Sequence, residues 1–115
     1  MRLLLICAML LPLAAQEKKD TASPPPQNLK VLKASTVAEV QQMMRTFTTG
    51  LGVQCSYCHV QGNFASDENP KKETARKMIR MAMKINAEFE DSKMHVSCYT
   101  CHRGEAEPKT APEPK

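Results

Sequence analysis

Cys55-Ser56-Tyr57-Cys58-His59 and Cys98-Tyr99-Thr100-Cys101-His102 are two copies of one five-residue pattern, C-x-x-C-H. Two cysteines separated by two residues lie on one side of a helical turn, where each thiol can add across a vinyl group of a porphyrin. The histidine that follows is then placed beneath the iron as an axial ligand. The pattern therefore predicts two covalently bound haem c groups. Their attachment residues would be Cys55, Cys58, Cys98 and Cys101, and the proximal iron ligands would be His59 and His102.

The composition indicates that such groups are needed to build an interior. The chain has 115 residues, enough for one small domain, and only 4% of them are aromatic, with no tryptophan. Domains with so little apolar bulk usually depend on disulfides, a metal or a cofactor. Two porphyrins would supply large flat apolar surfaces. The eight methionines would pack adaptably against them or bind iron through sulfur.

The N-terminus has the features of an export signal. Within residues 1–15, Arg2 precedes an apolar stretch at 3–13, and Ala14-Ala15 offers small residues for cleavage. The stretch is too short for a membrane-spanning helix. We therefore expect a signal peptide at 1–15, a periplasmic bacterial protein, and no membrane span after cleavage. An uncleaved anchor is the alternative.

Two polar segments flank the expected dihaem domain at residues 29–104. Residues 16–28 contain Pro24-Pro25-Pro26 and are interpreted as a proline-rich flexible lead. Residues 105–115 are charged and rich in proline, and we expect a disordered tail there.

A first helix is predicted after Thr36. Thr36 and Glu39 form a capping box, in which the hydroxyl accepts from the Glu39 amide and the carboxylate reaches back. Gly50 or Gly52 is expected to end this helix, just before the first motif. Between these points, apolar residues recur at spacings of three and four and share one face: Val37, Val40, Met44, Phe47 and Leu51.

A second helix is predicted from Asn69-Pro70, a favourable cap and first-turn pair, to about Phe89. The second motif follows after a short connector. The chain is therefore expected to be all-α, with few or no strands, and to repeat one haem-binding unit twice: helix, turn, C-x-x-C-H. The apolar stripe of the second helix comprises Ala75, Met78, Ala82, Ile85 and Phe89.

The remaining axial ligand of each iron is expected to come from the helix before each motif. Methionine sulfur is the usual ligand where electrons pass without substrate binding. Met43 and Met44 differ by about 100° around a helix, and Met44 is preferred because it lies on the apolar face. For the second iron Met78 is preferred, at the centre of its stripe, with Met81 as the closest rival. His95 lies close to the second motif and is interpreted as an exposed loop residue, with distal ligation as the alternative.

Charge gives a hint about partners. The net charge is +4, and Lys72, Arg76 and Arg80 recur every four residues on the second predicted helix. We interpret this flank as a solvated face, with haem propionates or an acidic redox partner as the sharper alternatives. The sequence has no basic patch with interleaved aromatic residues, so nucleic-acid binding has no support. It also lacks a nucleophile triad, paired carboxylates and a phosphate-binding glycine loop, so we do not expect an enzyme.

The sequence resembles a known family, the multihaem cytochrome subunit of photosynthetic reaction centres and its short bacterial relatives. In that family each haem unit is a helix, a turn and C-x-x-C-H, with a helix methionine as sixth ligand. The resemblance places this ligand on Met44 for the first haem and on Met78 for the second. It covers about residues 29–104 and is carried by Met44, the first motif, residues 64–70, 74–81 and 85–86, and Cys98-Tyr99-Thr100-Cys101-His102-Arg103-Gly104.

We therefore expect a dihaem c-type cytochrome that carries electrons in the periplasm. Reaction-centre subunits carry four haem units and this chain has two motifs. The resemblance thus implies a separate carrier that serves a redox protein or a membrane electron-transfer complex. One alternative is a haem peroxidase or small-ligand sensor with one open iron site. Another is a zinc or disulfide protein, although the two cysteine pairs lie farther apart than the roughly 15–20 residues of a zinc ribbon.

Overall fold

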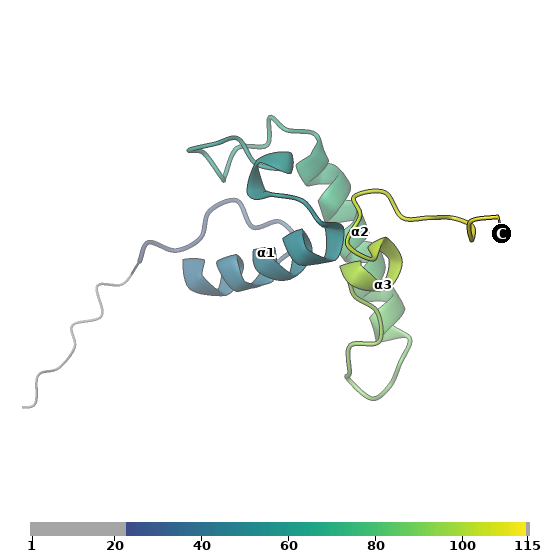
Figure 1. The fold of residues 1–115 in the computed structure, drawn as a ribbon. Helices are drawn as coiled ribbons and strands as arrows, with labels where there is room; N and C mark the ends of the chain where they lie inside the picture. Colours follow the sequence, from purple (N-terminus) through teal and green to yellow (C-terminus); the bar gives the residue numbers. More distant parts are fainter. Residues whose placement is uncertain (1–22, 115) are drawn as a thin grey trace, which may run out of the picture.

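The computed structural model describes residues 23–114, and all regular structure in this part of the chain is helical. Within it, the only strand-like pairing is an isolated bridge between Val60 and Asn63, inside a turn. The predicted all-α class is confirmed. The predicted signal at 1–15 and the beginning of the lead at 16–28 lie outside the described residues. The elements, in chain order, are α1 (Val37–Leu51), the short 3-10 helix η1 (Cys55–Tyr57), α2 (Lys71–Ala87) and α3 (Cys98–His102) (Figure 1).

Helix α1 begins at the capping box that the sequence predicts. The Thr36 hydroxyl accepts from the Glu39 amide at 3.2 Å. The Glu39 carboxylate accepts in return from the amides of Ser35 at 2.7 Å and Thr36 at 3.1 Å. These two amides hold the pKa of Glu39 below its ordinary value. The start of α1 is thus fixed by residues within one helical turn.

Of the two glycines that the sequence offers as terminators of α1, Gly52 ends the helix. It adopts a left-handed conformation with φ 65°, which glycine reaches without a clash from a Cβ atom. Gly50 remains inside the helix and is buried. Its burial follows from the packing of α1 against α3, and Figure 1 shows the last turn of α1 beside that short helix.

Helix α2 is slightly shorter than predicted. It begins at Lys71 with Pro70 as its N-cap residue, one residue later than the predicted pair of Asn69 and Pro70. The Lys71 amide donates to the Asn69 side-chain oxygen at 3.0 Å. It ends at Ala87 rather than near Phe89. The Phe89 amide bonds three residues back, at 3.3 Å, because the chain tightens into a turn. The Phe89 ring then stacks on the His95 ring with centroids 3.8 Å apart, which draws the end of the predicted stripe into the following loop.

The described residues 23–114 contain no buried apolar side chain. The buried residues there are Gly50, where the α1 backbone contacts α3, and Arg76, which carries a charge. Protein interiors are normally as densely packed as organic crystals, and the helices here do not create such an interior by themselves. Large apolar side chains are exposed instead: Phe64, Met78, Met81, Met83, Ile85, Phe89, Met94 and Tyr99.

One carboxylate joins three separate parts of the chain. Asp67, in the connector before α2, accepts from Lys30 at 2.7 Å, from Asn28 at 2.9 Å and from Arg76 at 2.8 Å. Lys72 lies 3.1 Å from the same carboxylate. These donors, Arg76 foremost, hold the pKa of Asp67 far below its ordinary value. Asp67 therefore fastens the segment before α1 to the first turns of α2.

This cluster corrects the interpretation of the basic flank on α2 as a solvated face. The Arg76 side chain is only 10% exposed and also contacts Glu73 at 3.4 Å. Lys72 donates to the carbonyl oxygens of residues 64–66 as well as contacting Asp67. Arg80 is the solvent-facing member, 47% exposed and 3.5 Å from Glu73. Long-range pairing, which helical spacing alone does not predict, turns most of this flank inward.

Asp67→Asn is expected to lower the melting temperature at neutral pH, because it removes the charge that compensates the buried Arg76. A carboxyl whose pKa is lowered by folding stabilises the protein above its unfolded pKa of about 3.9 and loses that contribution as the pH falls below it. The melting temperature of the wild-type protein should therefore fall more steeply between about pH 5 and pH 2 than that of the variant.

The matched control for this measurement is Glu113→Gln, which removes an exposed ion pair with Lys109 in the tail. It should leave the melting temperature nearly unchanged. Equal melting temperatures for Asp67→Asn and the wild-type protein at neutral pH would show that the cluster does not stabilise the fold.

Candidate functional site

Both C-x-x-C-H motifs fold as helical turns. In the first, η1 is followed by a bond of 2.9 Å from the His59 amide to the Cys55 carbonyl. In the second, the motif is the helix α3 itself, which begins after Ser97. Local backbone hydrogen bonds therefore hold the two cysteines and the histidine of each motif in one turn. Residues three apart on such a turn lie on the same side, so each pair of thiols can reach one flat ligand.

The two motif histidines share one hydrogen-bond geometry. Nδ1 of His59 lies 3.0 Å from the carbonyl oxygen of Phe64, and Nδ1 of His102 lies 3.0 Å from that of Glu105. A carbonyl oxygen only accepts, so Nδ1 is the donor in both rings, and in the neutral imidazole Nε2 then keeps its lone pair. Metal-binding histidines are commonly oriented in this way through their second nitrogen. The sequence pattern does not reveal these carbonyls, because both lie outside the motifs and become partners only when the chain turns.

The four motif cysteines are free thiols. Cys55 and Cys101 are exposed, whereas Cys58 and Cys98 are half-buried. Burial raises the pKa of the Cys98 thiol and that of the Cys58 thiol, where the charge of Lys71 opposes it. A protonated thiol exchanges slowly with disulfides. Within residues 23–114, no three His, Cys, Asp or Glu side chains are grouped as a metal site requires.

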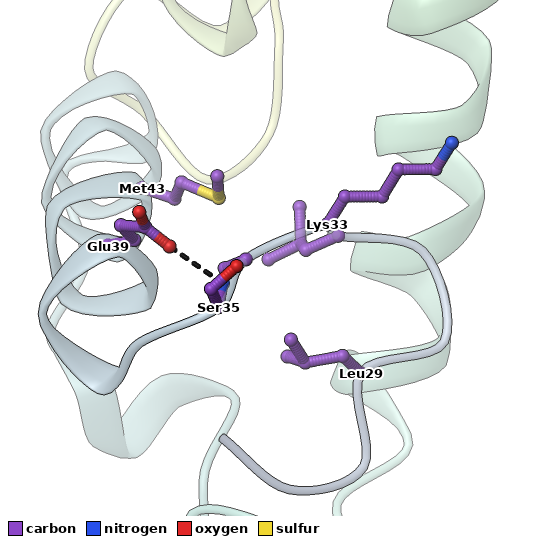
Figure 2. A pocket seen from close by; sticks show the side chains of 7 residues that line it. Leu29, Lys33, Ser35, Glu39 and Met43 are labelled. Carbon is purple, nitrogen blue, oxygen red and sulfur yellow. Dashed lines mark hydrogen bonds between the residues drawn. The ribbon is translucent and has the colours of Figure 1, made fainter. Parts of the chain in front are cut away.

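The candidate sulfur ligands lie on α1 and α2. Met43 and Met44 are both half-buried. Met43 projects into a pocket of about 700 Å³ that α1 forms with residues 29–35 (Figure 2). Adjacent residues of a helix point about 100° apart, so Met44 takes a different direction from Met43, and the preference for Met44 stays a prediction. On α2, Met78 is 44% exposed and Met81 is 49% exposed, so exposure does not separate these two and the preference for Met78 stays a prediction.

These residue types fit haem c. The thiols provide covalent attachment, and imidazole nitrogen and thioether sulfur are the axial ligands found in c-type cytochromes. Exposed apolar side chains lie on α2 and just after it, including Met78, Ile85 and Phe89. They offer the surface that a flat apolar group would cover. The exposed apolar side chains and the available ligand atoms are therefore both consistent with haem c.

Two asparagines fix the connectors on which the motifs depend. The Asn69 amide donates to the Tyr57 carbonyl at 3.0 Å, and Lys71 donates to the Tyr57 hydroxyl at 2.9 Å, which fastens the first motif to the start of α2. The Asn86 side chain donates to the Val96 carbonyl at 2.8 Å and accepts from the amides of His95 and Val96. Asn86 thus fixes the approach to the second motif. Both asparagines lie in the segments that carry the family resemblance, but the sequence pattern does not predict these contacts.

His95 is engaged away from the motifs. Its Nε2 lies 2.9 Å from the Asp91 carboxylate, and its ring stacks on Phe89. His95 holds the pKa of Asp91 below its ordinary value. These contacts favour the interpretation of His95 as a loop residue over distal ligation.

None of the helices within residues 23–114 has the length and apolar character needed to cross a bilayer.

Comparison with known proteins gives consistent matches. A model of the family described as the photosynthetic reaction centre cytochrome c subunit matches residues 7–112. The chain is 38% identical over 110 residues to the photosynthetic reaction center cytochrome c subunit of Thermochromatium tepidum, covering 89% of this chain and 27% of that protein. It is 42% identical over 81 residues to cytochrome c-554 of Chloroflexus aurantiacus, covering 65% of this chain and 20% of that protein. The chain thus spans about a quarter of the length of the curated relatives it matches.

Asn86→Ala is expected to lower the free energy of unfolding by about 1.5–3 kcal/mol, because three hydrogen bonds at the approach to the second motif are lost together. Denaturant unfolding measures this difference. Gln41→Ala, at an exposed position of α1, is the control and should change the free energy by less than about 0.5 kcal/mol. A result for Asn86→Ala within the range of the control would refute the assigned clamp.

Proposed function

Because this chain belongs to the family of the photosynthetic reaction centre cytochrome c subunit, we propose that it is a c-type cytochrome that carries electrons through two covalently bound haem c groups, one at each C-x-x-C-H motif. Covalent haem c and electron transport follow from the family. The number of haems, their ligands and the periplasmic location are the finer part of the proposal.

The observation that carries the proposal is the matching geometry of the two histidines. In both motifs a backbone carbonyl lies 3.0 Å from Nδ1, so each ring is held in the tautomer whose Nε2 binds a metal. The same arrangement occurs twice, each time directly after two cysteines that lie in one helical turn. Histidines with only a packing role would not be expected to share it. The repetition supports equal roles for the two motifs.

Each residue of the site then has a defined task. Cys55 and Cys58 attach the first haem, and Cys98 and Cys101 attach the second. His59 and His102 bind the irons on the proximal side. Met44 and Met78 are the proposed distal ligands, from the helices that precede the two motifs. When bound, haem supplies a one-electron couple between ferric and ferrous iron.

The protein contributes orientation and a fixed environment rather than acid–base chemistry. The carbonyl bonds to His59 and His102 orient both imidazoles. Met44 and Met78 would hold the irons from the other side, so little of the chain would have to rearrange when the charge changes. Such an arrangement would suit electron transfer.

The proposed place of action is the bacterial periplasm, and the proposed partner is a redox protein or a membrane electron-transfer complex. The expected export signal at residues 1–15 supports the location. The name of two relatives, photosynthetic reaction center cytochrome c subunit, supports the kind of partner.

The intact mass of the protein exported in a host that matures c-type cytochromes is expected to exceed the mass of the cleaved chain by two haems. The double variant Cys55→Ala and Cys58→Ala should carry one haem, and so should Cys98→Ala with Cys101→Ala. A wild-type mass without any haem would refute the proposal and favour the zinc or disulfide alternative.

Met44→Ala and Met78→Ala are each expected to abolish sulfur ligation at one iron, so that about half of the absorption produced by sulfur-bound ferric haem is lost. The neighbouring variants Met43→Ala and Met81→Ala serve as controls and should keep the full signal. Unchanged spectra for Met44→Ala or Met78→Ala would reassign that ligand. A wild-type spectrum with one open iron would instead favour the peroxidase or sensor alternative.

A further inference from the structure

We propose that the end of α1, which belongs to the first haem unit, positions the second haem-attachment segment, and that Gly50 is the positioning residue. This inference rests on the proposed function, since it assumes that both motifs attach haem. It assigns a task to a helix end that the sequence alone marks only as a terminator.

The contact at Gly50 leaves no room for a side chain. A Cβ atom placed on Gly50 would lie 2.9 Å from Cβ of Cys98 and 3.0 Å from the amide nitrogen of Tyr99. Both of those atoms are fixed to the backbone of α3, so no flexible side chain can move aside. The absence of a Cβ atom at Gly50 therefore sets how closely the first attachment cysteine of the second motif approaches α1.

A second contact holds the other end of the same motif. The Gly104 amide donates to the Gly50 carbonyl at 2.9 Å. A Cβ atom on Gly52 would overlap the Gly104 carbonyl oxygen, so this position also excludes any other residue. The end of α1 thus contacts the second motif at its first residue, Cys98, and the chain again at Gly104, two residues after His102.

The first motif is held in turn by residues at the start of α2. Asn69 and Lys71, at the start of the second unit's helix, bind Tyr57 inside the first motif. Each motif is therefore braced by an element of the other unit, and the two units are interlocked rather than independent.

This bracing matters for haem attachment because the step needs two thiols in register. In each bond formation the thiol S–H adds across a vinyl C=C, the sulfur bonds one carbon, and the hydrogen goes to the other. No electrons are gained or lost. Cys98 and Cys101 must reach the two vinyl groups of one porphyrin while His102 lies beneath its iron, so a shift of α3 away from α1 would misplace the set.

The test compares Gly50→Ala and Gly50→Val with Thr49→Ala, a matched control at the exposed neighbouring position. Alanine is a better helix former than glycine, so α1 itself gains from Gly50→Ala and any loss must come from its contact with α3. Each full-length protein is exported in a maturing host. Intact mass gives the number of haems, and peptide mapping assigns them to a motif.

Thr49→Ala is expected to carry both haems like the wild-type protein. Gly50→Ala should lower haem occupancy of the second motif several-fold while the first motif stays fully occupied, and Gly50→Val should lower it further. Full occupancy of both motifs in Gly50→Val would overturn the inference, and so would a proportional loss from both motifs, which indicates general unfolding. Failure of the proposed function is distinguishable, because the wild-type protein would then lack a haem before any substitution is made.

Discussion

The lack of buried apolar side chains in the described part of the chain is the constraint on which the rest of this structure depends. Folding is driven mainly by the burial of apolar surface, yet in residues 23–114 no apolar side chain is buried and large ones such as Met81 and Phe64 lie exposed. A chain of this kind needs apolar bulk that its side chains do not provide. Covalently bound porphyrins would provide it, so the group that performs electron transfer would also complete the fold.

In the described residues, polar contacts hold the helices and connectors together. Asp67 gathers Lys30, Lys72 and Arg76 from two separate segments, and Asn69 and Asn86 hold the connectors beside the two motifs. Burying a charge such as that of Arg76 is costly unless it is paired and hydrogen-bonded. Lys72, Arg76 and Asn86 lie on α2 itself, so these contacts join that helix to the connectors on either side of it, while Met78, Met81 and Met83 of the same helix remain exposed.

The geometry of the site and family membership lead to the same function by separate routes. The carbonyl partners of His59 and His102 are a property of this fold, whereas membership rests on sequence similarity across residues 7–112. The contact of α1 with α3 joins the helix before the first motif to the second motif. Asn69 and Lys71, at the start of α2, join that helix to the first motif.

The sequence by itself determined the local features. The capping box of Thr36 and Glu39, the helical turns of both motifs and the all-α class depend on residues within about one turn of each other, so their patterns are visible in the chain. Only the tertiary structure decided that Gly50 is a packing contact, that Arg76 faces inward and that α2 stops before Phe89. Each of these depends on a partner far away in the sequence or on a turn that brings a ring or a carbonyl back. Helical periodicity describes which residues share a face, but it carries no information about what that face meets.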